Sequence, residues 1–232
     1  PDEYELDPEY RALPVDLGDV CINYDIAWFW THDLPVPHAL EDLLMPEYNN
    51  LLVVENPATS SPGLAFLLAT IAEFGEDGYL DYWAALRDNG VEIVNSWEAA
   101  YYTNFSGSSG RGPQPMVVSY SSSPAAEFIF ADPPVPSPPT AAITNPGTCF
   151  RQIEFVGILS GTPNRDLAEK FIDFMLDGRN SADLTNLIGS GNPNLAAAQY
   201  IKPELKALPA VFPPKEVAAR LEQLKELTPA QR

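Results

Sequence analysis

Short apolar runs that each lead into a polar turn and then a helical pattern most constrain the fold of this chain. Residues 51–54 and 116–120 are such runs, and residues 91–94 form a weaker third. Continuous apolar runs bounded by polar residues are typical of strands buried in a parallel sheet. Helical patterns are expected over residues 39–45, 64–74, 77–89, 164–176 and 214–227. Strands that alternate with helices predict an α/β architecture with a mostly parallel sheet.

The turns that follow these strands are rich in hydroxyl groups. They are Thr59-Ser60-Ser61-Pro62-Gly63, Asn95-Ser96-Trp97-Glu98 and Tyr120-Ser121-Ser122-Ser123-Pro124. Ser61 before Pro62 predicts a helix that begins with a hydroxyl N-cap. For any single turn, helix capping explains the serines equally well. Three such turns at the carboxyl edge of one sheet favour a ligand site, where helix N-termini can bind an anionic group.

Aromatic residues accompany these turns. Trp97 and Tyr120 are explained either by packing or by contact with a flat, cationic ligand. Tyr101 and Tyr102 form the adjacent pair that ferric-ion carriers use, but helical neighbours point about 100° apart, so we expect one of them to pack inward. There is no paired-carboxylate signature, serine nucleophile elbow or phosphate-loop motif. The enzymatic signal is weak, and no cofactor is expected.

The two cysteines, Cys21 and Cys149, each lie in a strand-like run. The residues themselves leave open two buried thiols or one disulfide formed in an oxidising compartment. A catalytic thiol is less well supported, because neither neighbourhood supplies a cation or histidine that would lower its pKa. With only two histidines and no Cys-x-x-Cys motif, a metal site is not expected.

The charge balance excludes some classes of partner. The chain has 32 acidic and 13 basic residues, which gives a formal net charge of −19. Nucleic acids and anionic membrane surfaces require basic patches, so neither is an expected partner. The longest apolar run, residues 64–72, is too short for a membrane helix. An acidic surface suits a small cationic ligand or high solubility, and charge alone does not choose between them.

Five segments, taken in order, resemble the thiamine-binding substrate-binding proteins of ABC transporters over roughly residues 10–180. They are residues 13–25, 59–64, 97–101, 118–125 and 149–154. The resemblance implies the two-lobed type II periplasmic-binding-protein fold, with the ligand held in a cleft. It makes residues 1–18 an acidic loop and the entry to the hinge, 19–150 the second lobe, and 151–232 the return to the first lobe with C-terminal helices. It also implies a further segment before the start of this chain.

The resemblance assigns roles to particular residues. Ser60, Ser61 and Gly63 would bind the phosphate end of the ligand, and Trp97 and Tyr120 would pack against its rings. The expected ligand-binding set also includes Tyr101 and Asp19, and the resemblance favours a disulfide between Cys21 and Cys149. Two features depart from the family: Ala126 stands where a tyrosine is usual, and residues 191–194 lack the expected aromatic.

The function so predicted is capture of thiamine or its phosphates and delivery to an ABC permease. We expect a monomer in the periplasm or at the cell exterior, and a lipid anchor on an earlier segment is compatible with this location. One alternative of the same fold is a ferric-ion or polyamine carrier that uses Tyr101, Tyr102 or the acidic residues. A second alternative is a thiaminase-like enzyme, which would need Cys21 as a free nucleophile.

Overall fold

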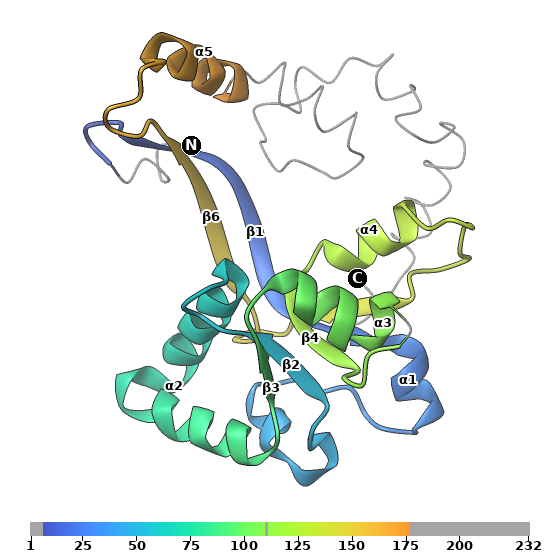
Figure 1. The fold of residues 1–232 in the computed structure, drawn as a ribbon. Helices are drawn as coiled ribbons and strands as arrows, with labels where there is room; N and C mark the ends of the chain where they lie inside the picture. The colour runs from blue at the N-terminus through green and yellow to red at the C-terminus, as the bar shows by residue number, and fades with distance from the viewer. Residues whose placement is uncertain (1–6, 110, 177–232) are drawn as a thin grey trace. The chain divides into compact units, whose positions relative to one another are not determined.

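The computed structural model describes residues 7–109 and 111–176 (Figure 1). Within this part the chain divides into two compact units. One consists of residues 18–152, and the other of residues 7–17 together with 153–176. All three hydroxyl-rich turns belong to the larger unit.

The described strands form one mixed sheet. Its order is β3 (Glu92–Val94), β2 (Leu52–Glu55), β4 (Met116–Tyr120), β1 (Ala12–Asp25) and β5 (Thr140–Ile143), and β6 (Phe150–Gly157) also pairs with β1 (Figure 1). β2 is parallel to both β3 and β4, whereas β1 is antiparallel to β4 and to β5. The expectation of a mostly parallel sheet is therefore wrong. β5 carries little sequence signal because it is four residues long and follows a proline-rich stretch.

Two apolar clusters lie on opposite faces of the sheet, because successive strand side chains alternate. In β2, Val54 packs with Phe66 and Leu86 of helix α2 (Ser61–Asp88). Val53 packs instead with Tyr101 in the π-helix η4 (Ala99–Asn104). Gly75 has a φ of 73° inside α2, which breaks it into two helical pieces. This break matches the two separate helical patterns expected for residues 64–74 and 77–89.

Shorter helices complete the larger unit. They are α1 (Ile26–Thr31), η2 (Glu41–Leu44), η3 (Pro46–Tyr48), α3 (Ser106–Ser109) and α4 (Ser123–Ile129). The glycine- and serine-rich composition of residues 104–115 predicts an exposed turn. Phe105 and Gln114 instead form a short bridge there, and Phe105 is fully buried. A glycine- and serine-rich composition hides this buried aromatic from a pattern-based prediction.

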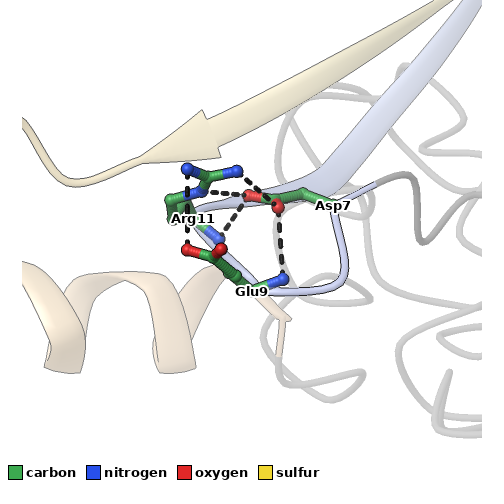
Figure 2. Close-up of polar contacts among 3 residues, drawn as sticks. All are labelled: Asp7, Glu9 and Arg11. Atoms are coloured by element: carbon green, nitrogen blue, oxygen red, sulfur yellow. Dashed lines mark hydrogen bonds and ion pairs between the residues drawn. The ribbon is translucent and has the colours of Figure 1, made fainter.

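The smaller unit contains the start of β1, most of β6 and helix α5 (Arg165–Leu176). β1 begins at Ala12, so part of the segment expected as an acidic loop is strand. A tight turn precedes it, in which the Asp7 carboxylate accepts hydrogen bonds from the Glu9 and Arg11 amides and from the Arg11 guanidinium (Figure 2). These contacts hold the pKa of Asp7 well below its usual range. The helix expected at residues 214–227 lies outside the described residues.

Candidate functional site

The three hydroxyl-rich turns meet at one edge of the sheet. Because β2 is parallel to β3 and β4, the carboxyl ends of these strands lie together. Hydrogen bonds connect the first two turns: the Thr59 hydroxyl donates to the Asn95 carbonyl at 2.8 Å, and the Asn56 amide donates to the Val94 carbonyl at 2.7 Å. Ligands of open α/β sheets bind outside this edge.

A second set of contacts connects the second turn, which contains Trp97, to the third turn, which contains Ser123. Trp97 Nε1 donates to Ser119 Oγ at 2.9 Å, and Ser119 Oγ lies 2.9 Å from Ser123 Oγ in the first residue of α4. Ser119 is fully buried. The position of Trp97, which follows β3, is therefore fixed by the end of β4.

Helix α2 begins directly at this edge. Its N-cap is Ser60 rather than the expected Ser61, which is the exposed first helical residue, and Pro62 is the second. The Ser60 side chain makes no capping hydrogen bond, and its buried hydroxyl has no partner among the described residues. The helix N-terminus is thus without a side-chain cap at the point where an anionic group would be bound.

Gly63 is buried where α2 packs against the end of β2. A Cβ at this position would lie 2.4 Å from the Glu55 carbonyl oxygen and 2.8 Å from the Glu55 carbonyl carbon. Both atoms belong to the backbone and cannot rotate away. Gly63 therefore permits the close approach of helix to strand that places Ser60 and Ser61 at the edge.

Three aromatic rings cluster around the second turn. The Trp97 ring stacks on Tyr101 with centroids 4.8 Å apart and an interplanar angle of 16°, and the edge of Tyr102 meets Trp97 at 5.3 Å. Tyr101 is only 2% exposed, whereas Tyr102 is 56% exposed. One tyrosine of the pair therefore packs inward, as expected for neighbours in a helix. Tyr102 is the member that presents its ring to solvent.

The environment of Tyr101 is unsuited to ferric ion, which is bound by phenolate oxygen. Burial raises the pKa of the Tyr101 phenol, and the Glu127 carboxylate raises it further. The hydroxyl makes no hydrogen bond of normal geometry within the described residues. Those residues also contain no group of three or more histidine, cysteine, aspartate or glutamate side chains arranged to hold a metal.

The remaining expected site residues do not share the surroundings of Trp97. Tyr120 packs beside the apolar cluster that contains Val54 and Val118, on the sheet face opposite to Ser119. Asp19 is engaged by Arg151, whose Nε and Nη2 donate to its two oxygens at 2.8 and 2.9 Å. A ligand touching both Trp97 and Tyr120 would have to lie across the strand ends, between the two faces.

Glu55 is the residue at this edge that pattern reading missed. It is the last residue of β2 and is 0% exposed, and neither carboxylate oxygen makes a hydrogen bond to another described residue. Burial raises the pKa of Glu55 to about 8. The sequence signal is a single acidic residue at the end of an apolar run, and this pattern is equally typical of the first residue of a polar loop.

Cys21 and Cys149 form a disulfide with their Cα atoms 4.4 Å apart. The described residues contain no free cysteine. The thiol nucleophile that a thiaminase-like enzyme would require at Cys21 is therefore not present.

Solved structures share this fold. The chain aligns with a periplasmic thiamin binding protein with a TM-score of 0.64 and 24% identity, covering 92% of this chain and 63% of that one. It aligns with a spermidine/putrescine transporter substrate-binding protein from Streptococcus pneumoniae with a TM-score of 0.55 and 19% identity, covering 91% and 62%. The fold is that of the type II periplasmic binding proteins.

The family follows from sequence. A family described as bacterial extracellular solute-binding protein matches residues 2–207, and the chain belongs to it. The family and the relatives described below are named as solute-binding proteins. No helix among the described residues has the length and apolar character needed to cross a membrane.

Curated relatives carry two different ligand names. The thiamine-binding periplasmic protein of Escherichia coli is 28% identical over 190 residues, covering 79% of this chain and 54% of its own. A putrescine/cadaverine-binding protein of Pseudomonas aeruginosa is 56% identical over 80 residues, covering 34% of this chain and 23% of its own. The chain spans about half the length of the thiamine-binding relatives it matches.

Proposed function

We propose that the protein captures thiamine or a thiamine phosphate at the edge formed by Ser60, Trp97 and Tyr120, and delivers it to an ABC permease. The observation that carries this proposal is the juxtaposition of the uncapped α2 N-terminus with the Trp97 and Tyr102 rings at the ends of parallel strands. The amides of the helix N-terminus suit a hydroxyl or phosphate group. The aromatic rings suit the flat, positively charged part of the ligand.

The acidic surface supports the same class of ligand. A formal charge of −19 attracts a small organic cation and disfavours a polyanion. The role proposed for the protein is that of a monomeric carrier in the periplasm or at the cell exterior, with the permease as its partner. The names of the thiamine-binding relatives support this assignment.

The second candidate is a diamine such as putrescine or cadaverine. Two observations favour it: the 56% identity to a putrescine/cadaverine-binding protein over 80 residues, and the buried, unpaired carboxylate of Glu55. A diamine has no ring to stack and no phosphate to bind. It would therefore depend on carboxylates and on cation–π contacts, and would leave the α2 N-terminus unused.

Ligand titration of the full-length protein distinguishes these candidates. Thiamine, thiamine monophosphate, putrescine and cadaverine are each titrated while tryptophan fluorescence is recorded and heat is measured by calorimetry. We expect saturable quenching by thiamine or its phosphate. Saturable binding of the diamines alone would replace the proposal with the second candidate, and binding of none of the four would refute both.

A pair of tryptophan variants tests the site. Trp97→Ala should weaken thiamine binding about 5- to 30-fold, because it removes stacking and cation–π energy on the order of 1–2 kcal/mol. Trp30→Ala is the matched control, because Trp30 is 85% exposed in α1, outside the three turns. Equal affinity of the Trp97→Ala variant and the wild type would refute the site assignment.

A further inference from the structure

Glu55 lies on the same face of the sheet as the residues that hold Trp97. Val53 packs in the cluster that contains Tyr101, and Glu55, two residues later in β2, points to the same side. Val53 is the register partner of Val117, so Ser119, two residues later in β4, lies level with Glu55. Neighbouring strands are about 5 Å apart, and Ser119 accepts the hydrogen bond from Trp97 Nε1. The Glu55 side chain is therefore about one side chain away from the indole.

Among the described residues, the elements that pack most extensively against β2 place no positively charged side chain beside Glu55. The elements with the most extensive contacts to β2 are β3, β4, η4 and α2. Their titratable or charged residues near β2 are Glu92 on β3, Tyr120 on β4, Tyr82 on α2, and Tyr101 and Tyr102 on η4 with Glu98 at its start. Glu127 of α4 lies beside Tyr101. Residues 56–71, which cover the turn and the first turns of α2, contain no charged side chain. The one basic residue of α2 is Arg87, in its last turn.

An unpaired buried carboxylate is stable only when it carries a proton or when a cation reaches it. In the free protein the proton remains, because burial raises the pKa of Glu55 to about 8. A positively charged ligand that stacks near Trp97 would supply the cation that the neighbouring elements lack.

We propose that Glu55 is the buried counter-charge of the binding site, and that binding of a cationic solute at Trp97 releases the Glu55 proton to solvent. This inference rests on the proposed function and adds a residue and a proton balance to it. The O–H bond of the Glu55 carboxyl breaks, the proton leaves to buffer, and the ligand's positive charge takes its place. The net charge of the site is unchanged by binding, and the site discriminates against neutral analogues of the same shape.

The strength of the coupling between ligand binding and Glu55 ionisation follows from the separation between the Glu55 carboxylate and the positive charge of the ligand. Two unit charges roughly 8 Å apart at an effective dielectric constant of about 20 change an equilibrium constant about 30-fold. By reciprocity, the cation is bound about 30-fold more tightly when Glu55 is ionised. The affinity for thiamine should therefore rise about 10- to 30-fold as the pH increases from 6 to 8.5.

Calorimetry in buffers of different ionisation enthalpy measures the protons released. With the full-length protein at pH 7.5 and thiamine as the probe, we expect about half a proton or more released per thiamine bound. Glu55→Gln keeps the shape of the side chain, and should abolish both the proton release and the pH dependence of affinity. Glu92→Gln, an exposed position on the adjacent strand, should leave both unchanged.

The outcomes separate this inference from the proposed function. Binding of thiamine by the wild type without proton release overturns the inference and leaves the proposed function standing, even if Glu55→Gln fails to fold. Equal proton release by wild type and Glu55→Gln overturns it as well. Absence of thiamine binding by the wild type overturns the proposed function and the inference together.

Discussion

The indole Nε1 of Trp97 donates a hydrogen bond to the buried Oγ of Ser119 at 2.9 Å, and this contact connects the turn after β3 to the end of β4. Trp97 also stacks on Tyr101, whose ring packs with Val53 and Val117. The aromatic side chain nearest to the proposed ligand is thus held by one hydrogen bond and one ring stack. Its orientation depends on the interior of the sheet as much as on its own turn.

Ser119→Ala should loosen Trp97 and lower stability together. The substitution leaves the indole N–H and the Ser123 hydroxyl without their partner, which costs about 1–3 kcal/mol in the free energy of unfolding. Urea unfolding followed by circular dichroism measures this loss, and thiamine titration measures the accompanying fall in affinity. Ser122→Ala is the control, because Ser122 is exposed and its side chain makes no capping hydrogen bond. A similar change in both variants would contradict the role given to Ser119.

Gly63→Ala should displace the start of α2. The added Cβ would overlap the Glu55 carbonyl group, so the helix must shift or the strand must bend, at a cost of about 2 kcal/mol or more. Gly78→Ala in the same helix is the matched control, since its Cβ would meet only Phe74 Cβ at 3.5 Å. We expect that control to be neutral or stabilising by up to about 1 kcal/mol, because alanine favours the helix. Thermal unfolding compares the two, and equal stability would show that the approach at Gly63 is not tight.

The sheet edge could be predicted because its strands carry a local signal. β2 and β4 are apolar runs bounded by polar residues, and the turn that follows each run is visible in the sequence. Two parallel pairings then bring the turns together, which follows from the topology that such alternation favours. Ser60 and Trp97 lie on these turns, and their roles in ligand binding, which the family resemblance implies, stay a prediction.

What escaped prediction depends on contacts between distant segments. The antiparallel pairing of β1 with β5 leaves no periodic signal, because β5 has four residues after a proline-rich stretch. Nothing local in the sequence indicates that Arg151 engages Asp19, 132 residues away. The burial of Glu55 likewise depends on the elements that cover β2, and an acidic residue at a strand end is more often solvated.

Reduction of the Cys21–Cys149 disulfide should destabilise the protein. The bridge spans 128 residues of sequence, and removal of such a crosslink costs roughly 2–5 kcal/mol, chiefly because the unfolded chain regains its freedom. Urea unfolding with and without reductant should therefore differ for the wild type. The double variant Cys21→Ser with Cys149→Ser supplies the control, because added reductant should leave its unfolding curve unchanged. Alkylation of denatured, unreduced protein should modify neither cysteine, and modification of both would contradict the disulfide.

The free energy of unfolding should fall as the pH rises from about 4.5 to about 8. In this range Glu55 is protonated in the folded protein and ionised in the unfolded chain. Its pKa is about 8 in the folded state against an ordinary value of 4.5, so the folded protein retains a proton that the unfolded chain loses. The stabilisation is complete below about pH 4.5, decreases as the pH rises, and is lost above about pH 8.

Chemical unfolding of the ligand-free wild type and of Glu55→Gln, measured at several pH values, isolates this contribution. The difference in the free energy of unfolding between the wild type and Glu55→Gln should shift in favour of the variant by about 4–5 kcal/mol from pH 4.5 to pH 8.5. Glu92→Gln should run parallel to the wild type, because Glu92 is exposed on β3. A constant difference between wild type and Glu55→Gln across this range would show that Glu55 ionises normally in the folded protein.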